Sequence, residues 1–481
     1  MGHGLVTPGR DIKERAAVAV ADPELQRALR NLDTRLHTAR AVSEHHADLK
    51  GRAAAIRRET LADLGAWLDR LQETLEGLGA HVHRCASPEE ARRVVLDVAR
   101  REGVRRAVKA KSMATEEIEL ADALEAAGIE TIETDLGEYV VQVAGERPSH
   151  IITPVIHKTL PQIAAVLSGE AGVGLPIDRD ALTEWVREHL RARFLDAEMG
   201  ITGANFVTAD TGTIVVVTNE GNGRFCTSLP RIHVSVMPVE KVVPRFADLG
   251  TLLPLLTMSA TGQRMSNYLS MVTGPRRPGE TDGPEQLHVV FLDHERTTLL
   301  GTPYEDMLAC IRCGACLNVC PVYRKVGGHA YDAVYTGPMG KVLTPLLSAG
   351  EDGRDLPGAS SLCGACTEAC PVEIPLADLL VRLRADLRSP GPPTGDRWPT
   401  RRRARRPRLF GAWARLWSHP AGYRATTALA RIGGRVASRG RGWTRRAPGL
   451  RGWTSSRDLP VPTNAPFRAR WRARARGERR W

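Results

Sequence analysis

The sequence has few cysteines outside two short clusters and contains no long apolar run. Only Cys85 and Cys226 of the nine cysteines in this 481-residue chain lie elsewhere, a distribution that argues against a secreted disulfide scaffold. No stretch approaches the roughly 18 uninterrupted apolar residues of a membrane-spanning helix. The N-terminus also lacks the apolar core of a signal peptide. We therefore expect a cytoplasmic protein that has no membrane span and works in a reducing compartment.

Acidic residues and lysine are almost missing from the last part of the chain. Residues 388–481 hold 25 arginines, no lysine and three acids, a formal charge of +22, so the rest of the chain carries −10 of the total of +12. Such a segment could contact nucleic acid, an anionic membrane surface or an acidic partner, or much of it could simply be solvated. Because no recognised nucleic-acid-binding fold accompanies the charge, we favour docking on a partner or on the inner face of a membrane.

Hydrophobic periodicity divides the remaining chain into a helical start and a mixed α/β part. Residues 11–77 repeat apolar positions every three or four residues, which predicts helices. Strand-like runs then occupy residues 80–85, 105–110 and 129–134. They alternate with helical stretches, of which the first opens at Ser87 with Pro88 in its first turn. This alternation predicts βαβ units and a parallel sheet.

A second sheet-rich portion follows the first. Its apolar runs lie at residues 212–224, 231–244 and 286–293. These runs look buried rather than half exposed, as in the strands of a covered sheet. A turn-rich loop is predicted at residues 274–285.

Two copies of one cysteine motif follow, CIRCGACLNVCP at residues 310–321 and SSLCGACTEACP at residues 360–371. Their spacing is that of bacterial ferredoxins, in which three close cysteines wrap one cubane cluster and the fourth cysteine ligates the cluster of the other motif. The predicted ligands of the first [4Fe-4S] cluster are Cys310, Cys313, Cys316 and Cys370. The predicted ligands of the second cluster are Cys320, Cys363 and Cys366.

The second motif lacks one ligand, because Ser360 stands where its first cysteine would be. The second cluster could then be a [3Fe-4S] centre, a [4Fe-4S] cluster with a non-cysteine or remote ligand, or absent, with three spare cysteines. Ser360 is a weaker candidate ligand than a thiolate, and Cys226, although it might fold over, is more often the kind of cysteine that is simply packed. We favour two [4Fe-4S] clusters, the second with an unidentified fourth ligand.

Glycine and proline support the iron–sulfur interpretation. Gly314 and Gly364 follow the second cysteine slot of each motif, where the missing Cβ permits unusual backbone dihedrals. Pro321 and Pro371 follow the last cysteines and can turn the chain away from a cluster. Zinc is the main alternative, but zinc sites usually take two C-x2-C pairs. Disulfides do not fit a reducing compartment.

Two segments could bind an anion. The turn TNEGNGR at residues 218–224 exposes backbone N–H groups beside Arg224. It matches neither the dinucleotide fingerprint nor the P-loop, so a tight turn is the favoured interpretation. A strand end before a helix places Lys109, Lys111 and Ser112 at a natural anion-binding location. A helix cap explains Ser112 or Thr115 equally well.

Three other residues could serve acid–base chemistry on a hydroxy acid, which needs a base with a pKa near neutral. They are Glu138, His150 and His157. Nothing in their spacing demands this role, so we expect satisfied hydrogen-bonding groups at loops or helix starts. No catalytic residue is assigned.

Long stretches of the sequence resemble the lactate utilization protein B family, which are iron–sulfur proteins of bacterial L-lactate oxidation. The resemblance covers nearly the whole chain from about residue 40. It rests on both cysteine motifs and on residues 109–120, 133–158, 201–224 and 452–471.

This resemblance implies a fold and a domain layout. A lactate-utilization α/β domain, similar in fold to NagB-type sugar isomerases and CoA-transferases, would span residues 70–295 after a helical segment at 1–69. An α-helical dicluster ferredoxin-like module would span residues 300–388, and a basic extension typical of the family would span 389–481.

The resemblance also implies a function. The chain would relay electrons, beside A- and C-type components and an electron acceptor, in a system that converts L-lactate to pyruvate and allows growth on lactate. No flavin or nicotinamide fingerprint is evident, so we expect an electron-transfer subunit of an L-lactate dehydrogenase complex. The alternatives are an isomerase or acyl-transfer enzyme with structural clusters, and an iron–sulfur nucleic-acid-binding protein.

Overall fold

The computed structural model describes residues 11–30, 47–348, 352–387, 408–438, 442–444, 458–461 and 467–476. The chain forms two compact units, residues 1–402 and residues 403–481. The first unit carries the α/β part together with both cysteine motifs. The predicted division of this unit into three domains stays a prediction.

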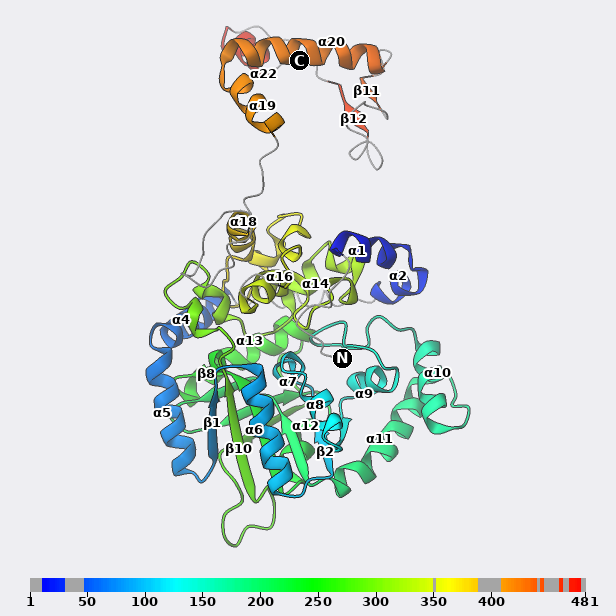
Figure 1. The fold of residues 1–481 in the computed structure, drawn as a ribbon, viewed down its shortest axis with the longest axis vertical. Coiled ribbons are helices and arrows are strands. Elements are labelled where there is room, and N and C mark those ends of the chain that lie inside the picture. Colours follow the sequence, from blue (N-terminus) through cyan, green and yellow to red (C-terminus); the bar gives the residue numbers. More distant parts are fainter. Residues whose placement is uncertain are drawn as a thin grey trace. The chain divides into compact units, whose positions relative to one another are not determined.

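A six-stranded parallel sheet forms the centre of the first unit (Figure 1). Its spatial order is β1-β10-β7-β4-β2-β3. The strands are β1 (His81–Cys85), β2 (Arg106–Lys109), β3 (Glu130–Glu133), β4 (Met199–Thr202), β7 (Ile232–Pro238) and β10 (Gln286–Leu292). The sheet confirms the βαβ prediction for residues 80–134.

The second sheet-rich portion divides between two sheets. Strands β7 and β10 enter the middle of the first sheet, where every residue of β7 is buried. Parallel strands are covered on both faces, so even the polar residues His233 and Ser235 of β7 are buried. The other strands of this portion form a small mixed sheet of order β8-β5-β6-β9: β5 (Phe206–Thr208), β6 (Ile214–Thr218), β8 (Val242–Val243) and β9 (Tyr268–Val272).

Helices cover both faces of the large sheet. One face packs against α6 (Pro88–Arg101), α7 (Met113–Glu117) and α8 (Leu120–Ala126). The other face packs against α5 (Leu64–Gly77) and the small sheet at the β1 side, and against α9 (Leu136–Val143), α10 (Leu160–Ala171) and α11 (Arg179–Asp196) at the β3 side. Ser87 caps α6 as predicted, because its hydroxyl accepts from the Glu90 N–H at 3.2 Å.

The cysteine motifs lie in a helical region beyond the carboxyl ends of the strands (Figure 1). Its helices are α14 (Ala315–Val319), α15 (Tyr323–Val326), α16 (Gly337–Leu347), α17 (Ala365–Glu368) and α18 (Leu376–Asp386), after the 3₁₀ helix η5 (Glu305–Ala309). Helices from elsewhere share this core: α1 (Ile12–Ala21), α2 (Pro23–Leu29), α4 (Ala47–Ala62) and α13 (Leu249–Thr261). The predicted helical start therefore divides, since α1, α2 and α4 join the cysteine-motif region and α5 packs on the sheet.

The second unit contains α19 (Arg408–Ser418), α20 (Pro420–Ser438), α22 (Phe467–Ala475) and a short hairpin of β11 (Trp443–Thr444) and β12 (Leu459–Pro460). Pro420 separates α19 from α20, as the sequence indicates. The rings of Trp413 and Trp417 lie 4.8 Å apart. Across all the described parts of the chain, no helix is long and apolar enough to cross a membrane.

Candidate functional site

Four cysteines from the two motifs surround one cavity. Cys310, Cys313, Cys316 and Cys370 all line it. This set matches the crossover pattern of ferredoxins, in which the last cysteine of the second motif joins the first three cysteines of the first. Backbone N–H groups already point at these sulfurs: Arg312 N donates to Cys310 Sγ at 3.4 Å, and Ile374 N donates to Cys370 Sγ at 3.3 Å.

The chemistry of these thiols fits a metal cluster. Burial raises the pKa values of Cys313 and Cys316 well above those of free thiols, and it raises the pKa of Cys370 to about 11. A positive metal centre would compensate the buried thiolate charges. In the described residues, no group of His, Cys, Asp or Glu is arranged to hold a single metal ion. In a cubane each sulfur binds a different iron, so the cysteines stand around the cluster instead of meeting at one centre.

The two motifs share one backbone geometry. Gly314 and Gly364 have left-handed φ angles of 76° and 84°, which confirms the predicted use of glycine. Two residues before each glycine, Arg312 and Leu362 also lie in the left-handed region, at φ 59° and 54°. Such backbone is costly for residues with a Cβ, so the surrounding fold holds it in place. The duplicated sequence therefore gives a duplicated loop.

The second motif is more open than the first. Cys320 and Cys366 are both buried. Burial raises the pKa of Cys366, and the nearby Cys320 raises it further. Lys341 Nζ lies 3.7 Å from Cys320 Sγ. Cys363 is exposed, and the Ala365 N–H lowers its pKa. Ser360 is half-buried, and its hydroxyl accepts from Leu362 N at 3.2 Å.

Neither cysteine outside the motifs joins them. Cys226 is fully buried in the apolar cluster that holds Val108 and Ile132, where burial raises its pKa to about 12. It packs as expected for a lone cysteine and does not fold over the second motif. Cys85 is buried in a different apolar cluster, on the face that packs on α6. All nine cysteines are free thiols, so the disulfide alternative is wrong.

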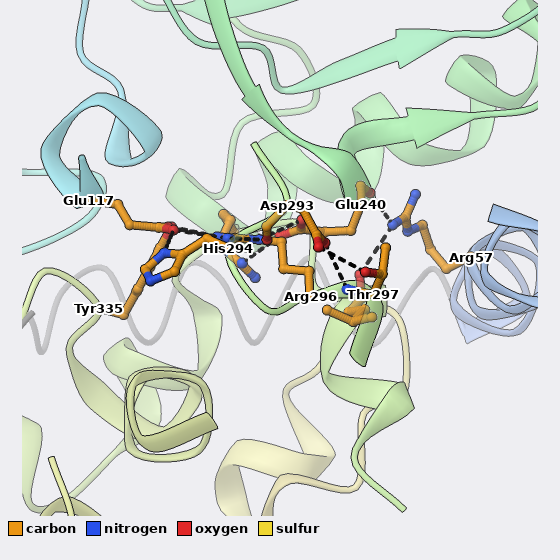
Figure 2. Close-up of polar contacts among 10 residues, drawn as sticks. Arg57, Glu117, Glu240, Asp293, His294, Arg296, Thr297 and Tyr335 are labelled. Atoms are coloured by element: carbon orange, nitrogen blue, oxygen red, sulfur yellow. Dashed lines mark hydrogen bonds and ion pairs between the residues drawn. The ribbon is translucent and has the colours of Figure 1, made fainter. Parts of the chain in front are cut away.

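A chain of buried charges joins the α/β part to the first motif, and Figure 2 shows its members Glu117, Arg296 and Glu240. Arg296 contacts Glu117 through two hydrogen bonds of 2.6 and 2.9 Å, and its Nε lies 2.8 Å from Glu240. Glu240 in turn pairs with Arg312 at 2.8 Å. Burial alone would raise the pKa of Glu117, but the Arg296 guanidinium outweighs burial and holds this pKa well below its usual range. The chain therefore stays ionised although it is removed from water.

Two further residues connect to this chain. The Tyr335 hydroxyl, which comes from the cysteine-motif region, donates to Glu117. Arg57 of α4 donates to the carbonyls of Glu240 and Val242 on one side and to those of Leu308 and Ala309 on the other. Its guanidinium thus ties α4 and the α/β part to the segment just before the first cysteine.

The predicted anion site at the end of β2 divides into two roles. Lys109 is fully buried and pairs with Glu116 at 2.8 Å and Glu133 at 2.6 Å. Lys111 instead lines two neighbouring cavities. Ser112 caps α7, as the helix-cap interpretation predicts, and it also lines the same two cavities. Thr115, the other predicted cap, is buried and supplies the N–H that Ser112 accepts.

Two of the three candidate acid–base residues, His150 and His157, form side-chain hydrogen bonds, as expected. His150 Nδ1 accepts from the N–H groups of Ile152 and Thr153, and its Nε2 lies 3.3 Å from Asn318 Oδ1 within the first motif. His157 contacts Ser149 Oγ at 2.8 Å and Glu146 at 2.7 Å, and burial lowers its pKa to about 4. Glu138 lies 3.8 Å from Lys111, and burial raises its pKa.

The turn at residues 218–224 follows β6 and leads into α12 (Asn222–Ser228). Glu220 and Asn222 line the one of these two cavities that Arg312 also lines. Arg224 is exposed and lines neither cavity. A Cβ on Gly223 would meet Thr218 Cγ2 at 2.9 Å, so close packing explains this glycine. The tight-turn interpretation is therefore confirmed for the glycine, and only part of the turn borders a cavity.

Sequence reasoning missed the buried charge chain and Lys241. Glu117 and Arg296 lie 179 positions apart, and Glu240 and Arg312 lie 72 apart. No local period connects such residues. The one available signal was Arg312, because an arginine between two predicted cluster ligands is placed where its charge must be accommodated.

Comparison with known proteins is consistent with this geometry. A model of the LUD domain matches residues 68–292, and a model of the 4Fe-4S dicluster domain matches residues 306–374. A solved structure of a DUF162 family protein from Deinococcus radiodurans aligns with 48% of this chain and with 98% of its own residues. The sequence identity is 15% and the TM-score is 0.26.

Several relatives are similar over most of their length. The uncharacterized electron transport protein YkgF of Escherichia coli is 45% identical over 79% of this chain and 80% of that protein. Lactate utilization protein B of Oceanobacillus iheyensis is 42% identical over 90% of this chain and 89% of its own, and that of Bacillus pumilus is 41% identical over 97% and 98%. The chain belongs to the lactate utilization protein B family, with a LUD domain followed by a 4Fe-4S dicluster domain.

Proposed function

We propose that this protein is the iron–sulfur electron-transfer component of a multi-protein system that oxidises L-lactate to pyruvate. The observation that carries the proposal is the cavity surrounded by Cys310, Cys313, Cys316 and Cys370, four thiols from two motifs that lie 50 residues apart. Iron–sulfur clusters transfer single electrons, and two of them can divide the two electrons that lactate releases. Cys320, Cys363 and Cys366 would hold the second cluster.

The different exposure of the motifs supports a direction for this transfer. The first motif is buried against the α/β part through Arg312 and Glu240. The second motif presents Cys363 and Leu362 at the surface, with Leu362 38% exposed. Because a partner can approach the second motif more closely, we propose that the second motif faces the electron acceptor or another component of the system.

The second unit supports a docking role at an anionic membrane surface on the cytoplasmic side. No acidic residue occurs in residues 408–438, which span α19 and α20. Large apolar side chains are exposed there: Trp413, Leu416, Trp417, Leu429, Ile432 and Val436. Arginine beside exposed tryptophan and leucine on a helix is typical of segments that lie on the membrane interface. Residues 388–407, where the arginines begin, fall outside the described residues.

Anaerobic purification with iron, sulfide and EPR measurements tests the proposal. About eight irons per chain would support two cubanes, and about seven would support one [3Fe-4S] centre. Adding L-lactate together with the A- and C-type proteins should reduce the clusters, whereas lactate without these proteins serves as the control. Clusters that never change oxidation state in the complete mixture would contradict electron transfer and support a structural role. Stoichiometric zinc in place of iron would overturn the assignment.

A further inference from the structure

A cavity of about 450 Å³ lies at the carboxyl ends of the parallel strands. Its wall includes Lys111 after β2, Asn205 after β4, Pro238 at the end of β7, and Lys241 just beyond that strand. In open α/β sheets this edge is where ligands bind, because loops and helix starts from several strands meet there. The volume is in the range of small-molecule sites. The cavity also reaches the first cysteine motif, since Arg312 forms part of its wall.

Three cationic side chains line this cavity: Lys111, Lys241 and Arg312. The side chain of Arg312 is 8% exposed, and only its Nη2 pairs with Glu240. Its Nη1 is buried and has no hydrogen-bond partner within the described part of the chain. Lys111 Nζ likewise lacks one there, and its ion pair with Glu138 is long, at 3.8 Å. Buried charged donors without acceptors are costly, so both nitrogens favour an anion beside them.

The acids in the same wall are engaged elsewhere. Asp135 caps α9 by accepting from the N–H groups of Gly137 and Glu138. Glu220 accepts from the Leu136 N–H at 3.2 Å. Neither carboxylate forms an ion pair with Lys111, Lys241 or Arg312 among the described residues. Lys111 and Arg312 therefore keep donors for a ligand.

The rest of the wall indicates what kind of anion fits. Apolar side chains of Ile152, Val155, Val217 and Leu256 border the cavity. Inorganic phosphate or sulfate would gain nothing from such a surface, whereas a carbon chain would. The cations and the apolar wall together fit a short organic acid.

We propose that this cavity binds a small organic carboxylate, with its carboxylate group beside Arg312, Lys111 and Lys241 and its carbon chain against the apolar wall. The choice of a short hydroxy or oxo acid within this class rests on the proposed function. Arg312 also donates its backbone N–H to Cys310 Sγ. One residue thus borders both the ligand and the first motif, which places the carboxylate next to the proposed first cluster.

Calorimetric titration of the anaerobic full-length chain, without partner proteins, tests the proposal. The probes are L-lactate, pyruvate, inorganic phosphate and lactamide, the last of which keeps the shape of lactate and lacks its charge. We expect one saturable site for lactate or pyruvate and none for phosphate or lactamide. Tighter binding of phosphate than of the carboxylates would show an inorganic-anion site and overturn the proposal, as would the absence of saturable binding of either carboxylate.

Two variants and a matched control locate the site. Lys111→Met should weaken carboxylate binding about ten-fold or more, because it removes one charged donor. Lys241→Met should do the same, and it supplies a second reading if Lys111→Met folds poorly by circular dichroism. Lys325→Met removes an exposed lysine outside the cavity and should bind like the parent. Unchanged binding in both folded cavity variants would overturn the proposal. The calorimetric titration does not measure reduction of the clusters. A negative titration would therefore leave the electron-transfer proposal intact, and clusters that never change oxidation state would leave the binding proposal intact.

Discussion

Single buried charges hold the cysteine-motif region against the sheet. Glu117 accepts hydrogen bonds from His294 and Arg296, which lie in the loop after β10, and from Tyr335 of the cysteine-motif region. Removing one partner from a buried ion pair leaves an uncompensated charge, which costs much more than the loss of an exposed pair. The stability of this junction therefore depends on a few individual carboxylates.

We expect Glu117→Gln to lower the free energy of unfolding by about 3–5 kcal/mol at pH 7. The matched control is Asp69→Asn, which removes an exposed pair with Arg84 and should change it by less than about 1 kcal/mol. Anaerobic urea unfolding measures both. Equal effects of the two variants would contradict a special role for the buried chain.

The same residue predicts a pH dependence. The pKa of Glu117 is depressed in the folded protein below its ordinary value of 4.5. The group therefore stabilises the fold fully above the ordinary pKa and loses this contribution as the pH falls below it. Urea midpoints of the parent and Glu117→Gln should converge as the pH is lowered from 5 toward 3. A constant difference over this interval would show that Glu117 is not ionised in the fold.

Cysteine pairs test which thiols share a cluster. Cys310→Ala and Cys370→Ala should each lose about four irons, and the double variant should lose no more than either single variant, because both remove ligands of one cluster. Combining Cys363→Ala with Cys370→Ala should lose iron from both clusters. Cys226→Ala is the control and should keep the parent's iron content, since this thiol packs in a separate apolar cluster. Additive iron loss for Cys310 and Cys370 would contradict the crossover set.

At the scale of elements, close packing sets the position of α12. A Cβ on Gly200 of β4 would lie 1.9 Å from the Cys226 carbonyl oxygen of α12. Strand and helix therefore approach as closely as backbone atoms allow, which carries Asn222 at the start of α12 to the cavity wall. Glycine in this strand marks a backbone contact.

We expect Gly200→Ala to destabilise the protein by about 1–3 kcal/mol or more, because α12 or β4 must shift. Gly169→Ala is the matched control: this glycine lies inside α10 with no atom within 4 Å of an added Cβ. It should stabilise by about 0.5–1 kcal/mol through helix propensity. Thermal unfolding of the two variants under one condition gives the comparison, and a harmless Gly200→Ala would contradict the close approach.

The elements show what sequence could and could not predict. Local patterns predicted β1 to β3, the Ser87 cap and the left-handed glycines correctly, since each depends on neighbouring residues. They did not predict that β7 and β10 would enter the first sheet, because strand order depends on contacts between distant segments. The same limit hid the buried charge chain, whose members come from α4, α7 and the loops after β7 and β10. The cysteine spacing predicted which four thiols line one cavity, because ferredoxin-type motifs place three of the four cysteines within one short segment, whereas the assignment of all seven cysteines as ligands stays a prediction.

At the scale of the whole molecule, the two units predict separable properties. Both cysteine motifs and the buried charge chain lie within residues 1–402, and the exposed apolar and arginine-rich helices lie within residues 403–481. Removing the second unit should therefore leave iron content and the melting temperature of the first unit unchanged.

Sedimentation with lipid vesicles tests this separation. The full chain should bind vesicles that contain phosphatidylglycerol more strongly than neutral phosphatidylcholine vesicles, and added salt should weaken the binding, because arginine charge contributes to it. A chain that ends at residue 402 should bind neither. Equal binding of this shortened chain to anionic vesicles would place the membrane contact elsewhere.

The unequal exposure of the twin loops has a consequence for handling the protein in air. Cys363 is open to solvent, whereas Cys313 and Cys316 of the first loop are buried in a cavity that Met339 of α16 also lines. Dioxygen and peroxide should therefore attack the outer centre first, and the brown colour should bleach in two stages, a fast loss of about half the absorbance followed by a slow one. Aerobic preparations would then consist of molecules that retain only one of the two clusters. An activity measured on such preparations would be lower than the activity of the intact protein.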